Sequence, residues 1–173
     1  ANLGIDPVSG ALVFQSVNRS RARIEGIEGE WQWTPGFSTD WEFRAAAAWA
    51  RGRDLARDRP LNSVAPARIV LGASWAPVRA DYGVEAVATG VAGQSRLDES
   101  AGPLFHAPGH GLFDLHAWWR PAQEVRVNLS LLNAFDRRHW DWSTVRGVSA
   151  TAGDLEFYTR PGRSLALSVS FDW

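Results

Sequence analysis

Several common kinds of residue are missing from this chain of 173 residues. There is no cysteine, which excludes disulfide bonds and thiolate metal sites. All 18 cationic residues are arginine, and the formal net charge of −1 gives no indication of a nucleic-acid partner. There is no methionine, and no apolar run is long enough for a signal peptide or a membrane-spanning helix. We therefore expect residues 1–173 to be one section of a longer protein.

What the chain does contain is alternation of apolar and polar residues, together with ten tryptophans. The C-terminal stretch "RSLALSVSFDW" changes character at every residue, which is typical of a β-strand with one apolar face. The same two-residue period, weakest in the fourth segment, predicts about seven strands, within residues 11–33, 38–52, 66–77, 82–96, 111–121, 124–133 and 163–173. The first of these segments could be one long strand or two strands.

The connections between the predicted strands alternate in length along the chain. Three are short turns ("TPGF", "PVRAD" and "RPAQ"), and three are long loops at residues 53–65, 97–110 and 134–162. Short turns at one rim and long loops at the other are typical of an outer-membrane barrel. The pattern therefore favours an all-β, antiparallel transmembrane β-barrel, of which this chain is a partial section.

Six tryptophans support the same interpretation, because they lie near a short turn or the chain end and share the apolar face of their strands. They are Trp31, Trp33, Trp41, Trp75, Trp119 and Trp173. Aromatic rings at one level are expected at a membrane–water interface, so we predict that they form a belt there and that lipid is a partner. The alternative is a soluble β-sandwich that binds carbohydrate and has tryptophans as its stacking platform.

Two stretches, "NAFDRRHWDWSTVRG" and "YTRPGRSLALSVSFDW", resemble the C-terminal end of TonB-dependent outer-membrane receptors, in particular the branch that takes up haem or haem-protein iron. Ala134 and Arg160 replace the leucine and glutamine that are more usual in that branch. "ARIEGIEGEW" and "PLNSVAPARIVLG" are similar to other barrel strands of the family. The resemblance runs from about Arg19 to Trp173.

The resemblance implies a function and a set of partners. Such receptors have about 22 strands around a plugged lumen, so this chain would be the last third of the barrel in the outer membrane of a Gram-negative bacterium. It implies TonB-dependent import of an iron-bearing ligand, with haem as the transported ligand and no cofactor held by this section. It also implies the TonB complex as a partner, through a plug that this chain does not contain. A C-terminal strand with Phe171 and Trp173 is similar to the signal read by the barrel-assembly machinery.

Candidate ligand-contact residues lie in the long loops. His106 and His110, in "FHAPGHG", could bind haem iron or a metal if the turn brought them together, although Pro108 and Gly109 break any helix between them. In "RRHWDW", the side chains of Arg137, Arg138, His139 and Trp140 could bind haem propionates and the porphyrin face. The alternative for both groups is a purely structural role in a folded loop.

Other functions receive less support from the sequence. The family's axial histidines lie outside this section, so none is transferred to it, and we expect no metal site of its own. A siderophore or another nutrient remains an alternative ligand for a receptor of the same family. No nucleophile motif is present, so we do not expect an enzyme.

Overall fold

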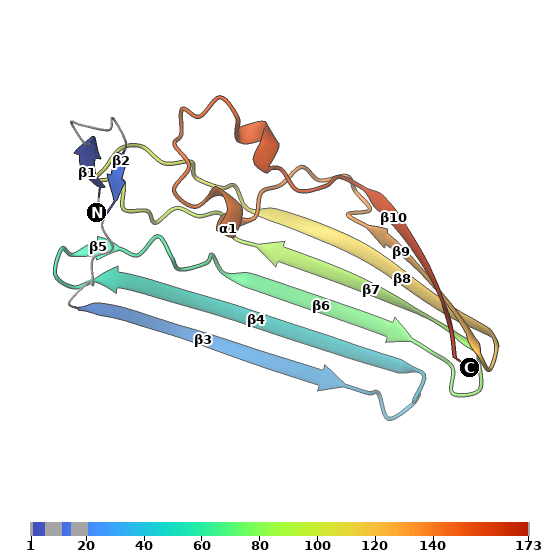
Figure 1. Cartoon of the computed structure of the whole chain (residues 1–173). Coiled ribbons are helices and arrows are strands. Elements are labelled where there is room, and N and C mark those ends of the chain that lie inside the picture. Colours follow the sequence, from blue (N-terminus) through green and yellow to red (C-terminus); the bar gives the residue numbers. More distant parts are fainter. Residues whose placement is uncertain (1, 6–11, 15–20, 173) are drawn as a thin grey trace.

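The computed structural model describes residues 2–5, 12–14 and 21–172 of the chain (Figure 1). Seven strands pair in the order β10-β9-β8-β7-β6-β4-β3, and every neighbouring pair is antiparallel. Their bounds are β3 Ala22–Trp33, β4 Trp41–Asp54, β6 Arg68–Trp75, β7 Tyr82–Val91, β8 His110–Ala122, β9 Val125–Leu132 and β10 Ser164–Phe171. The prediction of an antiparallel sheet whose strands follow one another in chain order is confirmed.

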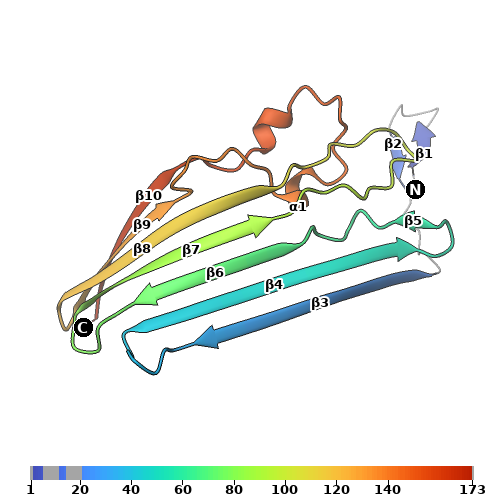
Figure 2. The ribbon, with the colours of Figure 1, turned by 180° about the vertical axis from the view of Figure 1, so that it is seen from behind.

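Three shorter strands lie outside this path. β5 (Arg59–Pro60) pairs with the end of β4, while β1 (Asn2–Ile5) and β2 (Leu12–Phe14) form a two-stranded sheet of their own. The sequence allowed the segment 11–33 to be one strand or two, and its described residues include β2 and β3, which belong to different sheets. In the described residues, β3 and β10 are the two edges of the main sheet, which remains open as Figures 1 and 2 show.

The strand register places most large apolar side chains on one face of the sheet. Directly paired residues share a face, and the series Trp33–Phe43–Ala73–Ala86–Leu115–Leu131–Leu165 crosses all seven strands through such pairs. We call this side the apolar face. The neighbouring residues on each strand point to the opposite, polar face, which carries Glu28, Glu30, Glu42, Arg44, Glu85, His116 and Arg126.

The apolar face is exposed instead of being covered by a second layer. Ile27 is 76 % exposed, Leu165 is 73 % exposed and Leu167 is 68 % exposed. Across the described ranges, the only buried hydrophobic residues are Ala107, Trp142 and Val145, and none of them lies on a main-sheet strand. Because no second sheet packs against this one in the described chain, the sandwich alternative does not describe the fold. An uncovered apolar surface of this extent marks a site of contact with lipid or protein.

Short and long connections lie at opposite ends of the sheet (Figure 1). Residues 34–40, 76–81 and 123–124 join the strands at what we call the turn end. Residues 55–67, 92–109 and 133–163 join them at the loop end, where the third connection includes helix α1 (Trp142–Val145) and the 3-10 helix η1 (Leu155–Tyr158). This is the separation of loop lengths that the sequence predicts.

Aromatic rings near the turn end form a continuous row on the apolar face. Ring centroids are 6.0 Å apart for Trp31 and Trp33, 5.6 Å for Trp33 and Phe43, and 5.8 Å for Phe43 and Trp41. The row continues through Trp75 to Tyr82, the cross-strand partner of Trp119. Trp173 lies outside the described residues. The position of these rings at a membrane interface remains a prediction.

The apolar face has a second aromatic level toward the loop end. Trp49 is half exposed and lies on the same face of β4 as Trp41. The strand segment from Trp41 to Trp49, both included, is nine residues long. Phe113, on the same face of β8, has its ring 5.7 Å from that of Phe135, in the loop after β9. A transmembrane strand needs about 9–11 residues, so the spacing of the two levels matches one hydrocarbon layer.

Among the described residues, no helix is long and apolar enough to cross a membrane.

Ala45 and Ala46 give a matched test of the two faces. Ala45 lies between Trp31 and Leu71 on the apolar face, and Ala46 lies between Glu30 and Val70 on the polar face. In the full-length protein, Ala45→Arg should destabilise the folded state by about 2–4 kcal/mol, because the new guanidinium would point into hydrocarbon. Ala46→Arg should cost far less, because its side chain would meet Glu30. Urea unfolding in lipid vesicles measures both, and equal costs would contradict the assignment of faces.

Candidate functional site

The loops at the loop end pack into a small folded unit with its own core. Residues 92–109 and 133–163, which we call the loop unit, contribute the buried Ala107, Trp142 and Val145. Other side chains pack around these three, namely Leu97, Phe105, Trp140, Val148 and Tyr158. Backbone hydrogen bonds join the two loops, from Phe105 N to Val148 O at 2.8 Å and from Ala150 N to Pro103 O at 3.1 Å. The loop unit therefore holds a defined shape at the end of the sheet.

The "NAFD" sequence that opens the long connection forms a turn that anchors the unit. Asn133 and Asp136 both adopt positive φ, at 50° and 54°. The buried Asn133 side chain accepts a hydrogen bond from Arg137 N at 2.8 Å and donates one to Arg137 O at 2.9 Å. Asp136 Oδ1 accepts from Arg163 N at 2.8 Å, which ties the start of the loop to its end. Asparagine and aspartate suit these positions because they tolerate left-handed backbone.

The predicted ligand-contact residues of "RRHWDW" divide into two exposed and two packed side chains. Arg137 and Arg138 are exposed. The Arg138 guanidinium is ion-paired with Glu156 and lies 5.1 Å from the centre of the Trp140 ring. Trp140 packs against Phe105 and donates a hydrogen bond from Nε1 to Leu155 O at 2.9 Å, while His139 is buried. The accessible part of this cluster is therefore the arginine pair, held on a rigid base.

The two histidines of "FHAPGHG" have different neighbours. His106 Nε2 lies 3.2 Å from Glu99 Oε1. The hydrogen bond from the backbone N–H of Leu104, followed by this contact with His106, lowers the pKa of the exposed Glu99 carboxyl. The His110 ring instead lies 4.7 Å from that of His139, whose Nδ1 is 3.1 Å from Arg137 O. The pairing of His110 with His139, 29 positions away, could not be read from the sequence spacing. Within the described ranges, no group of three or more potential ligands could hold a metal ion.

The polar face carries a network of charged and hydrogen-bonded side chains. Arg44 is ion-paired with Glu85 and lies 3.3 Å from Glu42, which accepts a hydrogen bond from Gln32 at 2.8 Å. His116 Nδ1 is 2.9 Å from Ser130 Oγ, within hydrogen-bonding distance. Such a surface suits a water-filled or plugged interior, because each polar group has a partner or access to water.

A tryptophan on this polar face could not be interpreted from the sequence. Trp118 lies flat against Gly83, where an added Cβ would be only 2.6 Å from its Nε1. The Arg126 guanidinium covers the Trp118 ring at 5.1 Å from its centre. The absence of a side chain at Gly83 therefore leaves space for the Trp118 ring. The cation–π contact with Arg126 holds that ring against the polar face of the sheet.

The sequence matches the family described as TonB dependent receptor-like, beta-barrel, over residues 2–134. The chain belongs to this family. The match covers more than three-quarters of the 173 residues and includes β3 to β9. The resemblance found in the sequence motifs is confirmed at the level of the family.

Curated relatives include receptors that are named for haemoglobin and haem. The chain is 23 % identical over 187 residues to the Haemophilus influenzae "Probable hemoglobin and hemoglobin-haptoglobin-binding protein 4", covering 91 % of this chain and 18 % of the relative. It is 21 % identical to the Neisseria meningitidis "Hemoglobin-haptoglobin utilization protein B", and the match covers 91 % of this chain and 22 % of that relative. It is 28 % identical to the Haemophilus influenzae "Heme/hemopexin utilization protein C", and the match covers 80 % of this chain and 20 % of that relative. The chain thus spans about a fifth of the length of these relatives.

A solved structure has the same fold. The copper transporter OprC superposes with a TM-score of 0.74 at 23 % sequence identity, covering 87 % of this chain and 23 % of that chain. The open sheet therefore has the fold of a section of barrel wall.

The loop unit can be tested through its core. Trp142→Ala removes a buried ring, and the lost packing should cost the unit about 3–5 kcal/mol. Because the unit has few other buried residues, it should open, and protease added to intact cells should cleave residues 92–109 or 133–163 at least about tenfold faster. The matched control is Ser143→Ala, at an exposed position of the same helix. Equal cleavage of both variants would contradict the packed unit.

Proposed function

We propose that this chain forms part of the barrel wall of an outer-membrane receptor that imports an iron-bearing ligand, with haem as that ligand. The observation that carries the proposal is the similarity to receptors named for haemoglobin and haem over 91 % or 80 % of the chain. TonB-dependent receptor barrels are outer-membrane proteins of Gram-negative bacteria, which gives the exposed apolar face a natural environment in lipid.

The two faces of the sheet support this placement. The apolar face would contact lipid between its two aromatic levels, at Trp41 and Trp49, where indole rings find both hydrocarbon and water. The polar face would line the barrel interior. Its arginines and carboxylates would face a plug contributed by another part of the receptor. This section then supplies a rigid wall, and transport would be driven by the TonB complex acting on that plug.

Ligand capture is assigned to the loop unit. Its exposed Arg137 and Arg138 lie beside each other in sequence on a turn fixed by Asn133, and two guanidiniums suit the two propionates of haem. The other candidates would support them indirectly or from the neighbouring loop. His139 and Trp140 hold the loop in shape, His106 is accessible beside Glu99, and His110 supports His139.

Assembly into the membrane is assigned to the last strand. Phe171 ends β10 on the apolar face and is 61 % exposed. A terminal aromatic residue on an alternating strand would serve the barrel-assembly machinery as a recognition signal, and the unpaired edge of β10 would offer backbone groups for its capture.

Haem capture is tested with the arginine pair in the full-length receptor. The double substitution of Arg137→Ala and Arg138→Ala should weaken haem and haemoglobin binding at the cell surface by at least about tenfold, because charge-assisted hydrogen bonds to the propionates are lost. Outer-membrane levels should not change. The control is Arg146→Ala, an exposed arginine of the same loop.

The outcome separates the alternatives for this receptor. Normal haem binding by the double variant would indicate that the two arginines have a structural role and do not bind the ligand. If the unmodified receptor bound ferric siderophores and not haem, the ligand would be wrong while the receptor assignment would stand.

A further inference from the structure

One corner of the sheet concentrates arginine residues just past the aromatic level at Trp49. Arg51 is the next residue after Trp49 on the apolar face of β4, because side chains alternate along a strand. Beyond it, the end of β4, the loop that follows and the loop after β7 carry Arg53, Arg57, Arg59 and Arg96. The apolar band of the strand therefore ends in a cationic corner.

Most of these arginines already have a carboxylate partner. Arg53 is 2.9 Å from Asp58, Arg57 is 3.8 Å from Asp54, and Arg59 is 3.6 Å from Asp98. Arg51 and Arg96 differ, because neither forms an ion pair with any residue in the part of the chain that the structure describes. Glu25, the cross-strand partner of Arg51, is paired with Arg23 instead.

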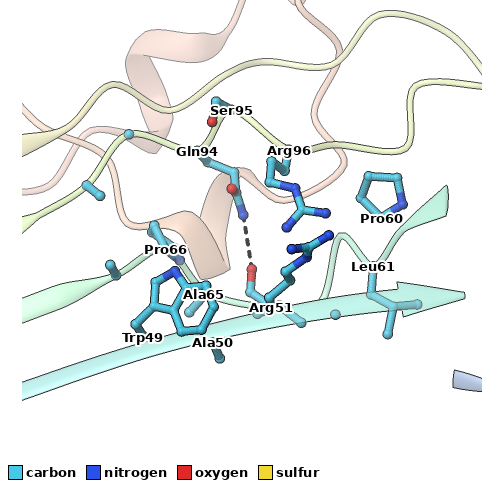
Figure 3. Close-up of a pocket in the computed structure, with 15 residues that line it drawn as sticks. Trp49, Ala50, Arg51, Pro60, Leu61, Ala65, Pro66, Gln94, Ser95 and Arg96 are labelled. Atoms are coloured by element: carbon cyan, nitrogen blue, oxygen red, sulfur yellow. Dashed lines mark hydrogen bonds between the residues drawn. The ribbon is translucent and has the colours of Figure 1, made fainter. Parts of the chain in front are cut away.

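The two unpaired guanidiniums share one pocket. It has a volume of about 150 Å³ and is lined by Trp49, Arg51, Pro60, Leu61, Gln94 and Arg96, among others. Figure 3 shows the Arg51 and Arg96 guanidiniums facing each other across it, with the Trp49 ring on the same side of β4 as Arg51. Two like charges in this position repel each other unless an anion lies between or beside them.

The backbone next to Arg96 is anchored within its own loop. The neighbouring Gln94 donates from Nε2 to Val64 O at 3.0 Å and from its backbone N to Ala107 O at 2.9 Å. The backbones of Gly93 and Gly109 come so close that an added Cβ on Gly109 would be 2.9 Å from Gly93 N. The backbone beside both arginines is therefore anchored, by strand pairing at Arg51 and by these loop contacts near Arg96.

We propose that Arg51 and Arg96 together bind the phosphate group of an outer-leaflet lipid. Arginine guanidiniums bind phosphate oxygens in a bidentate manner, and two of them would neutralise a doubly charged monoester. We select a lipid over a transported ligand because two of the residues that line the pocket, Trp49 and Arg51, lie on the apolar face of β4. An acyl chain of such a lipid would run along the exposed apolar surface past Trp49. The inference rests on the outer-membrane placement but not on haem as the ligand.

The test uses the full-length receptor purified in detergent, with phosphorylated lipid A and its dephosphorylated counterpart as probes. The unmodified receptor should retain the phosphorylated lipid in native mass spectra and discriminate against the dephosphorylated one. The double substitution of Arg51→Gln and Arg96→Gln should reduce that binding by at least about tenfold, as expected for the loss of charged hydrogen bonds. The matched control is Arg53→Gln, on the same strand and face but with its charge already paired to Asp58; it should retain the lipid.

Folding and the source of the phosphate are separated by further measurements. Heat-modifiable electrophoretic mobility identifies variants with an intact barrel, and Arg96→Gln alone, in a loop, provides a second variant that leaves β4 unchanged. Equal lipid retention by the folded double variant and the unmodified receptor would overturn the proposal. So would arginine-dependent stabilisation by inorganic phosphate without any lipid retention, because the site would then take a free anion. Failure of membrane insertion in the unmodified receptor would instead contradict the proposed function.

Discussion

The structure depends on the pairing of every strand with the strand that follows it, because this sheet has no core to hold it together. Along β3 to β10, the backbone groups between neighbouring strands are satisfied by the antiparallel ladder. In a hydrocarbon layer an unpaired backbone group is costly, so the ladder itself becomes the main stabilising element of the wall. The side chains then only have to match their surroundings, apolar on one face and polar on the other, as the neighbouring residues Trp31 and Glu30 show.

Among the described residues, hydrophobic side chains are buried only in the loop unit. Trp142 and Val145 lie in the loop unit, and their packing resembles the core of a small soluble protein. In the proposed membrane placement, the chain would combine two kinds of stability, with lipid-dependent packing along the strands and water-dependent packing in the loops. This division explains why charged residues such as Arg137 and Arg138 can be presented to solvent from a fixed backbone.

Much of the fold could be predicted from the sequence because its information is local. A two-residue period defines strands, and the alternation of short and long connections defines the two ends. The pairing of His110 with His139, the match of Trp118 with Gly83 and the approach of Arg51 to Arg96 could not be predicted. Each depends on how residues from separate strands and loops meet, which neither spacing nor composition encodes. The candidate cluster in "RRHWDW" was found from its residue types, but the burial of His139 within it emerged only from the structure.

The separation of turns and loops affects how such a protein can change over time. Each strand of the main sheet pairs with its neighbours in the chain, and three of the six connections are confined to short turns at one end. At the other end, doubling the length of a flexible loop adds only about 0.6 kcal/mol of closure entropy, and it leaves the register of the strands untouched. Insertions at residues 55–67, 92–109 or 133–163 can therefore accumulate while the wall keeps its shape. A wall of this kind can acquire new ligands by altering the loops alone, without redesigning the strands that carry them.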